Sequence, residues 1–318
     1  MEETRETVPV SISPVGWACG STRRGTSHAR DGRPCQDAHA IWSSSFMGEP
    51  ILAVAVADGH GGQRHDLSHR GAALAVQAAV GEVIASLPAP GDDDTWRPVP
   101  GSEEEFHHRV NARWKEYVIA DAGRGPELST DGKGGPELFT RYGSTLLLAL
   151  IDRSECWVGQ IGDGDILLVR PDGSIEAPIP KDETLLGTVT YSLSSRDSPG
   201  LWRTARFPLG TGGLLLMATD GLSDSFENPE SEFRVFARSL LERVTGFGIE
   251  RVGSALPGWL DGYSQNGSGD DMTLVLVSLN PAPGAGVPGR QAGEERSAPG
   301  EGTGPGPGGE KVQETGAG

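Results

Sequence analysis

An apolar run ends abruptly at an acid in the stretch Ile51-Leu52-Ala53-Val54-Ala55-Val56-Ala57-Asp58-Gly59-His60-Gly61-Gly62. A short continuous apolar run that is bounded by glycines is typical of a buried strand. A carboxylate at a strand end lies at the edge of a sheet, where distant chain segments can meet. The stretch therefore predicts a buried strand that carries Asp58 and His60 into a site at its end.

Three more aspartates, Asp163, Asp220 and Asp270, also border an apolar run and a glycine-rich or acidic turn. Hard divalent cations such as Mg²⁺ and Mn²⁺ take oxygen ligands, and several strand-end carboxylates meet that demand. Asp58 suits a bridging position, and Gly59 lets a backbone carbonyl approach an ion. Two ions about 4 Å apart would acidify a water and hold a phosphoryl group for hydrolysis. The pattern predicts metal-assisted phosphate hydrolysis.

Apolar periodicity predicts an α+β fold. Helices are expected in sequential pairs rather than in alternation with strands, which favours antiparallel sheets with helices outside them. We expect a four-layer α/β/β/α sandwich, in which two stacked, mainly antiparallel sheets are flanked by helix pairs. The expected strands are 15–22, 38–42, 51–57, 144–151, 156–161, 166–170, 202–209, 214–219 and 272–279, and the expected helices are 76–87, one from Ser102, 233–244 and 249–263.

Composition predicts one folded domain over 13–279, after a flexible N-terminus at 1–12. Pro, Gly and Asp predict loop insertions at about 89–101 and 123–138. Residues 280–318 are rich in Pro, Gly, Ala and Glu and have no apolar periodicity. Such a segment cannot bury enough surface to offset its ordering entropy, so we expect a disordered tail.

The charge and cysteine content exclude several classes of protein. A formal net charge of -17 argues against non-specific nucleic-acid binding. The three cysteines are far apart and form no C-x-x-C pair, which indicates reduced thiols rather than disulfides or a zinc site. The polar N-terminus is unlike a secretory signal, and no apolar run reaches the roughly 20 residues that a bilayer requires. We expect a soluble, cytoplasmic monomer with no membrane partner.

Several local patterns have simpler explanations than a functional site. Asp172-Gly173 is expected to be a turn, and the glycine clusters lack the lysine of a nucleotide-binding loop. Asp163-Gly164-Asp165 does not continue as an EF-hand. Among the seven histidines, a solvated face is expected for His65, His69, His107 and His108, and His60, between two glycines beside Asp58, is the exception.

Six motifs in the same order resemble those of the metal-dependent protein serine/threonine phosphatases of the type 2C class, in their bacterial form. The resemblance covers roughly 15–279. The motifs are CQDAH at 35–39, VADGHGG at 56–62, YGST at 142–145, GDGD at 162–165, ATDGLSD at 218–224 and GDDMT at 269–273.

This resemblance implies two bound Mg²⁺ or Mn²⁺ ions and a phosphorylated protein substrate. It implies that Asp58 bridges the ions, with the Gly59 carbonyl, Asp220 and Asp270 as further ligands. The remaining implied roles are a water-ordering acid for Asp37, a third, weaker metal site for Asp163 and a general acid for His60.

The chain also departs from the family pattern on the substrate side. Gly32 stands where the family commonly has an arginine that holds the substrate phosphate. Arg33, Arg30, Arg24 and His28 are all candidates to replace it, and the sequence does not choose among them. Further departures are Gln36 for a frequent glutamate, Asp165 for an arginine and Asp271 for an asparagine.

We therefore expect Mg²⁺/Mn²⁺-dependent hydrolysis of phosphoserine and phosphothreonine in proteins. The missing arginine motivates an alternative, a catalytically weak phosphatase-like module that binds a phosphoprotein or a regulator. A hydrolase of small phosphate esters on the same fold stays open as a third hypothesis.

Overall fold

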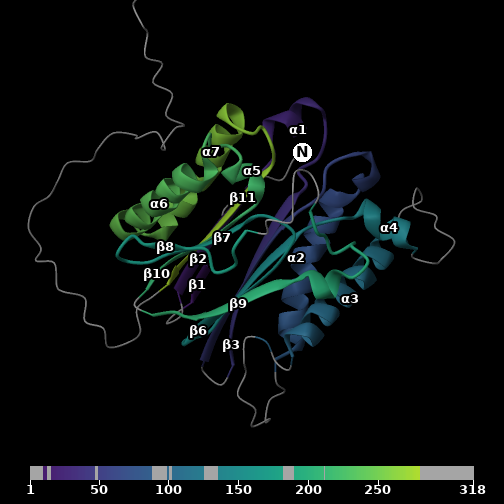
Figure 1. The fold of residues 1–318 in the computed structure, drawn as a ribbon, viewed down its shortest axis with the longest axis horizontal. Coiled ribbons are helices and arrows are strands. Elements are labelled where there is room, and N and C mark those ends of the chain that lie inside the picture. Colours follow the sequence, from purple (N-terminus) through teal and green to yellow (C-terminus); the bar gives the residue numbers. More distant parts are fainter. Residues whose placement is uncertain are drawn as a thin grey trace, which may run out of the picture.

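The protein forms four layers, two stacked sheets with a helix pair on each outer face (Figure 1). This computed structural model describes residues 10–12, 16–46, 49–87, 99, 102–124, 135–181, 190–210 and 212–279. The layers confirm the α+β, α/β/β/α sandwich that the sequence predicts.

One sheet has six antiparallel strands in the order β1-β2-β11-β10-β7-β8. Its neighbouring strands β10 and β11 are distant in sequence, and the end of β10 lies beside the start of β11. The bounds are β1 Val10–Ile12, β2 Gly16–Arg23, β7 Asp165–Val169, β8 Ile175–Glu176, β10 Gly213–Ala218 and β11 Met272–Leu279.

The other sheet has five antiparallel strands in the order β3-β4-β5-β6-β9. The register of its first pair places Asp37 directly opposite Asp58. Two acids therefore share one end of this sheet. The bounds are β3 Asp37–Phe46, β4 Glu49–Asp58, β5 Leu146–Ile151, β6 Glu155–Ile161 and β9 Arg203–Pro208.

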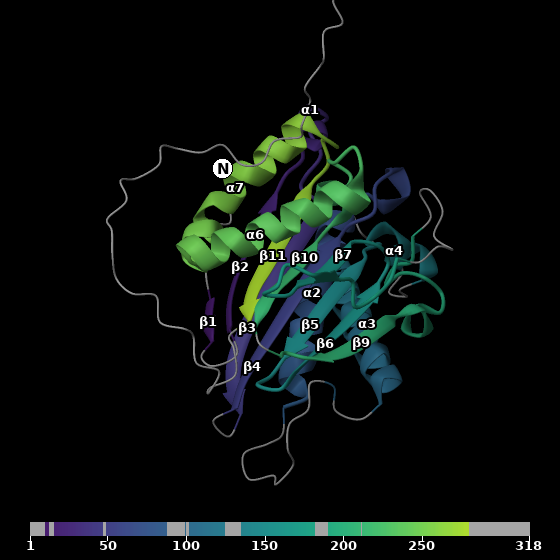
Figure 2. The same ribbon diagram turned by 60° about the vertical axis from the view of Figure 1, so that its left-hand side comes forward.

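Two helix pairs cover the outer faces of the sheets (Figure 2). Helices α2 and α3 pack on the five-stranded sheet, and α6 and α7 pack on the six-stranded sheet. Ser102 caps α3 by accepting a hydrogen bond from the Glu105 amide at 3.1 Å, as its capping box predicts. The bounds are α1 Thr26–Arg30, α2 Ser68–Ala85, α3 Glu103–Ala122, α4 Pro136–Arg141, α5 Asp220–Ser223, α6 Arg234–Phe247 and α7 Ile249–Asn266.

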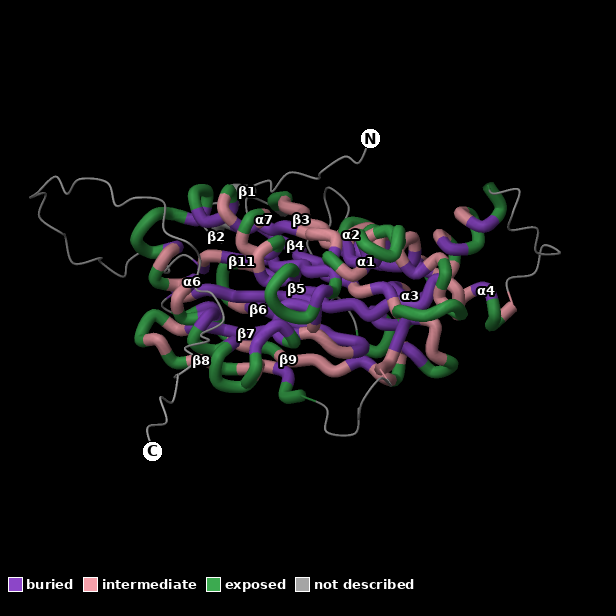
Figure 3. The backbone as a smooth tube through the Cα atoms, turned by 90° about the horizontal axis from the view of Figure 1, so that it is seen from above, coloured by how far each residue is buried: buried purple, intermediate pink, exposed green. Residues whose placement is uncertain are grey.

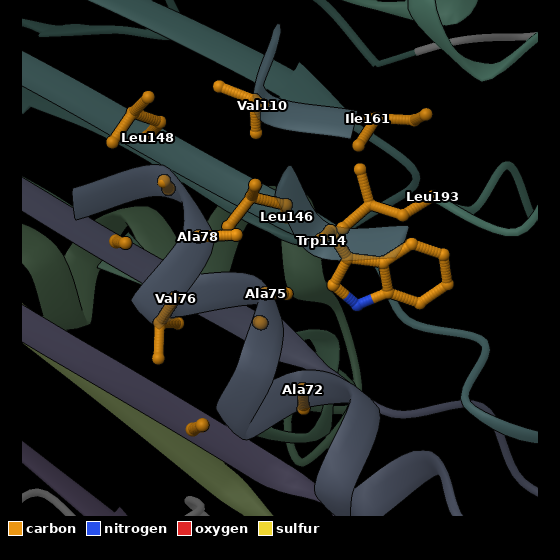
Figure 4. Close-up of a cluster of buried hydrophobic side chains, with 14 of the residues drawn as sticks. Ala72, Ala75, Val76, Ala78, Val110, Trp114, Leu146, Leu148, Ile161 and Leu193 are labelled. Atoms are coloured by element: carbon orange, nitrogen blue, oxygen red, sulfur yellow. The ribbon is translucent and has the colours of Figure 1, made fainter. Parts of the chain in front are cut away.

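Three apolar clusters separate the four layers, and the central strands are buried on both faces (Figure 3). In β4, Ala53 and Ala55 pack with the α2/α3 layer, whereas Leu52 and Val54 pack between the sheets. The small alanines let α2 approach closely, and Trp114 of α3 fills the adjoining space (Figure 4). Burial on both faces explains why β4 has a continuous apolar sequence rather than an alternating one.

The structure differs from the expected elements in several places. Residues 10–12 form an edge strand, although they fall in the segment expected to be flexible, because they pair with β2. Residues 136–138 begin α4 rather than ending a loop, since Pro136 suits the first turn of a helix. Helix α2 begins at Ser68 instead of near residue 76. Helices α1 and α5 have five and four residues, too few for apolar periodicity to reveal them.

Several expectations concern residues outside the described part of the chain. These are the N-terminal segment 1–9, most of the expected insertions at 89–101 and 123–138, and the tail 280–318. Among the described helices, none combines the length and apolarity needed to cross a membrane.

The packing of α2 yields a stability prediction. A Cβ on Gly71 would lie 1.8 Å from the backbone oxygen of Tyr142, so the helix could not keep its place. We expect Gly71→Ala to lower the free energy of unfolding by about 2 kcal/mol or more, as overpacking does. Urea unfolding followed by circular dichroism measures this change.

Gly81 in the same helix provides the matched control. A Cβ there would lie 3.2 Å from the Tyr117 hydroxyl and 3.3 Å from Arg113 Cδ, which are atoms of flexible side chains. Gly81→Ala should be neutral or should stabilise by up to about 1 kcal/mol through helix propensity. Equal destabilisation by the two variants would contradict the packing argument.

Candidate metal centre

Asp37 and Asp58 lie opposite each other where β3 begins and β4 ends. Thr145, just before β5, holds the backbone of Asp58 from both directions. Its side-chain oxygen accepts a hydrogen bond from the Asp58 amide at 3.0 Å, and its amide donates to the Asp58 carbonyl at 2.8 Å. With its backbone satisfied, Asp58 presents its carboxylate to a cavity.

The six-stranded sheet supplies Asp220 and Asp270 to the same cavity. Asp220 begins α5 directly after β10, and Asp270 stands two residues before β11. Because β10 and β11 are adjacent, their acids meet those of the other sheet at one end of the sandwich. The cavity has a volume of about 850 Å³ and is lined by Asp58, Gly59, His60, Asp163, Asp220 and Asp270, together with Ser27, His28, Arg33, Gln36, Gly61, His65, Thr190, Ser192, Ser194, Ser195, Asp224 and Ser268.

Burial and mutual repulsion raise the pKa values of these acids. Burial is the largest cause at Asp58, followed by the charges of Asp37 and Asp220. Burial also raises the pKa of Asp220, with the charge of Asp163 next. The pKa of Asp163 is itself raised by burial. Oxygen donors that repel one another in a partly buried cluster suit a hard divalent cation, which removes the repulsion by binding them.

Asp37 is buried beside Asp58 but is not among the residues that line the cavity, and it is held by the other sheet. Thr219, at the end of β10, donates a hydrogen bond of 2.7 Å from its hydroxyl to Asp37 Oδ2. The same hydroxyl accepts a bond of 2.9 Å from the Thr273 amide. Burial, followed by the charge of Asp271, raises the pKa of Asp37. Thr219 therefore couples the ends of β10 and β11 to β3.

The structure explains why Gly59 follows Asp58. A Cβ at this position would lie 2.6 Å from the Ser68 carbonyl oxygen and 2.8 Å from that of Gln36. The Gly59 amide donates to the Gln36 carbonyl at 3.0 Å, so the backbone is held against its neighbour. Only glycine fits there, and the position lines the cavity as the sequence predicts.

His60 lines the cavity beside a second histidine, which the sequence assigned wrongly to a solvated face. The rings of His60 and His65 meet edge to face with centroids 5.2 Å apart. His65 reaches the cavity because the chain turns back at Gly62, whose φ is 95°. Burial, followed by the neighbouring His65, lowers the pKa of His60 to about 4. A Cβ on Gly143 would lie within 3 Å of both rings, so the glycine at this position is the one sequence feature that fits two histidines packed here.

His107 is also wrongly expected on a solvated face. Its ring is buried and stacks on Trp202, with centroids 4.7 Å apart and planes 6° from parallel. Burial lowers its pKa to about 4. The residue is a packing element of the α3 layer and does not line the cavity. His108, by contrast, is exposed as expected.

The structure separates the candidates for the missing phosphate-binding arginine. Gly32 has a φ of 70° and open space around it. Arg33 lines the cavity and pairs with Asp31 at 3.2 Å. Arg30 pairs with the same acid at 3.4 Å, but its side chain is 76% exposed and does not line the cavity. Arg24 donates to the His28 carbonyl at 3.2 Å.

His28, the remaining candidate, lies in the cavity wall and is buried. Its imidazole lies between the carboxylates of Asp270 and Asp271. It therefore faces acids of the centre rather than open space.

Four hydroxyl side chains that the sequence does not predict form another part of the cavity wall. Thr190, Ser192, Ser194 and Ser195 belong to no helix or strand and share no periodicity, so no sequence pattern indicates them. Ser192 is anchored by accepting a hydrogen bond from the Ser144 amide at 3.0 Å. These hydroxyls can donate hydrogen bonds to phosphate oxygens.

Comparisons with known proteins agree with this geometry. A family model described as protein phosphatase 2C matches residues 24–261. A comparison with curated protein sequences gave no match.

Solved structures share the fold at low sequence identity. RsbX in complex with magnesium is 16% identical, with a TM-score of 0.53, and the match covers 86% of this chain and 100% of that one. The catalytic domain of the serine/threonine phosphatase PstP, in complex with two manganese ions, is 19% identical over 83% and 97% of the chains, with a TM-score of 0.53. Serine/threonine phosphatase Stp1 from Staphylococcus aureus is 17% identical over 88% and 100%, with a TM-score of 0.54.

The raised pKa values predict how the metal-free protein responds to pH. The folded cluster keeps protons that the unfolded chain has released, so stability falls as pH rises from about 4 through the raised pKa values. Asp58→Asn removes one repelling charge. In chelator at pH 7.5, it should therefore increase the free energy of unfolding by about 1 kcal/mol or more, and the gain should shrink at pH 5.

Urea unfolding at the two pH values measures this effect, with Asp197→Asn at an exposed acid as the control. Added Mn²⁺ should stabilise the unsubstituted protein and the control but not Asp58→Asn, because a ligand stabilises only the state that binds it. An Asp58→Asn protein that is less stable than the parent in chelator would contradict the repulsion argument.

Proposed function

The chain belongs to the protein phosphatase 2C family, and we propose that it hydrolyses phosphoserine and phosphothreonine in proteins with two Mg²⁺ or Mn²⁺ ions. The family assignment makes it a protein phosphatase that depends on divalent metal. The observation that carries the finer proposal is the convergence of Asp58, Asp220 and Asp270, from both sheets, on one cavity. Asp163, in the same wall, is proposed to hold a third, weaker ion.

Bound metal would supply an acidified water and neutralise charge on the phosphoryl oxygens. The protein holds the proposed ligand residues in place. Thr145 fixes the backbone of Asp58, and the Thr219 hydroxyl fixes one oxygen of Asp37. Asp37 is proposed to order a water bound at the centre. The Gly59 carbonyl is a further proposed ligand, which the close backbone packing at that residue supports.

His60 is proposed to protonate the departing seryl or threonyl oxygen. Its ring lines the cavity, and its lowered pKa makes it neutral near pH 7. The imidazole therefore has to receive a proton during the reaction before it passes one to the leaving group. His65, whose Nδ1 lies 2.6 Å from the Thr140 carbonyl oxygen, holds the edge of the His60 ring.

The first test of this function is metal dependence. We expect turnover of an aryl phosphate and a phosphopeptide with Mn²⁺, complete loss in chelator and recovery when Mn²⁺ is restored. Asp58→Ala should lower kcat/KM by at least about 100-fold, because the proposed bridging ligand is lost. Activity that survives both chelator and Asp58→Ala would rule out the two-metal mechanism.

The second test concerns the phosphate-binding arginine. Arg33 lines the cavity and Arg30 does not, although both pair with Asp31. Arg33→Ala should raise KM for a phosphopeptide about tenfold, roughly the 1.5 to 3 kcal/mol of a charged hydrogen bond, with less effect on kcat. Arg30→Ala is the matched control and should leave both constants within about twofold. Equal effects of the two substitutions on KM would contradict a role for Arg33 in binding the substrate phosphate.

The open space at Gly32 favours a second candidate function, a catalytically weak module that binds a phosphoprotein or a regulator. Calorimetry with a phosphopeptide at saturating Mn²⁺ separates the two. Binding without turnover supports the module, whereas efficient turnover eliminates it. Parallel assays with small phosphate esters test the third hypothesis, since a metabolite hydrolase would prefer them to phosphopeptides.

A further inference from the structure

His28 is placed by the short helix α1, which is hydrogen-bonded to the segment just before β11 and to α7. The Ser27 amide donates to the Gly269 carbonyl at 2.9 Å, and the Thr26 amide donates to the Ser264 hydroxyl at 2.9 Å. The His28 side chain is only 7% exposed. The ring is therefore a fixed part of the cavity wall rather than a mobile surface group.

Asp271 anchors this region and has both oxygens engaged. Oδ1 accepts a hydrogen bond of 2.6 Å from the Gly25 amide, and Oδ2 accepts one of 2.5 Å from the Gln36 amide. The same Oδ2 lies 2.8 Å from His28 Nδ1. Asp271, which is buried, therefore acts as an acceptor that can orient His28 and is poorly placed to bind an ion itself.

The two ring nitrogens of His28 face different acids. Nδ1 is buried and makes no well-aligned hydrogen bond, but Asp271 Oδ2 is the acceptor within its reach. Nε2 lies 3.2 Å from Asp270 Oδ1, and the Asp270 side chain is 56% exposed toward the cavity. When Nδ1 carries the proton, the lone pair of Nε2 faces a carboxylate. In that tautomer two lone-pair donors face each other at 3.2 Å, and a cation bound by both removes their repulsion.

We propose that His28 Nε2 is a ligand of the ion that Asp270 binds, with Asp271 orienting the ring through Nδ1. Two ligand atoms about 2.1 Å from one octahedral ion and at right angles to each other lie about 3 Å apart, close to the observed 3.2 Å. A histidine ligand commonly gives its other N–H to a carboxylate, which is the role of Asp271 here. The proposal rests on the proposed function, because it takes Asp270 as a metal ligand.

A nitrogen ligand changes the metal preference of the centre. Imidazole suits transition metals, whereas Mg²⁺ prefers oxygen ligands and water. His28 therefore biases this centre toward Mn²⁺ over Mg²⁺. The contact with His28 also gives a reason for an aspartate rather than an asparagine at position 271. An anionic carboxylate orients a neutral imidazole better than the amide of an asparagine would.

Calorimetric titration with Mn²⁺ and with Mg²⁺ measures the bias. His28→Gln should weaken one Mn²⁺ site at least about tenfold and weaken Mg²⁺ binding less. Asp271→Asn should weaken the same Mn²⁺ site by about 10- to 100-fold, as loss of an orienting carboxylate does. His108→Gln, at an exposed histidine, is the matched control and should bind both metals as the parent does.

The structure of the Mn²⁺-loaded parent protein tests the ligand without any substitution. Anomalous density should lie within about 2.4 Å of both His28 Nε2 and an Asp270 oxygen. Density on Asp270 with no contact to His28 would overturn the proposal, even if the His28→Gln protein failed to fold.

The remaining outcomes separate this proposal from its rivals. Unchanged Mn²⁺ affinity in His28→Gln, together with weaker inhibition by inorganic phosphate, would make His28 a phosphate anchor and overturn the metal-ligand role. Unchanged metal binding and unchanged phosphate inhibition would leave it a packing residue. A parent protein that binds no Mn²⁺ would defeat the proposed function as well, whereas normal parent binding with an unaffected variant defeats only this inference.

Discussion

The repulsion among carboxylates that two sheets bring to one end of the sandwich is the constraint on which the centre depends. Asp58 comes from the five-stranded sheet and Asp220 from the six-stranded one, and burial makes their mutual repulsion more costly. The scaffold opposes that repulsion with apolar contacts spread over three clusters. The fold thus holds an unfavourable arrangement of charge in place for a cation to relieve, which is typical of functional sites.

Tight backbone contacts convert this fold into a site of defined shape. Gly25 and Gly221 each lie where a Cβ would come within 2.5 Å of the backbone of Asp270 or Asp271, so α1 and α5 both pack directly on the start of β11. Gly59 plays the same part on the other sheet. The acids are consequently held by main-chain packing, which deforms less readily than side-chain contacts.

Sequence reasoning located the features that are encoded locally. The apolar run before Asp58 and the acid after β10 are strand ends, and periodicity reveals strand ends directly. Sequence reasoning failed where the position of a side chain depends on packing between distant segments. His65 enters the wall through a turn at Gly62, and His107 is buried by Trp202, which lies nearly a hundred residues away. Likewise, no sequence pattern indicates that Arg33, which follows α1, lines the cavity whereas Arg30, the last residue of α1, does not.

The buried Thr219 to Asp37 hydrogen bond joins the two sheets beside the centre. The full set of acids comes together only when the two sheets are stacked, so neither half of the sandwich holds it alone. An ion that binds acids from both sheets also bridges the layers. Metal supply would then govern not only turnover but also how long the layers stay together, so a metal-starved protein should open first at this end and become the easier target for proteolysis.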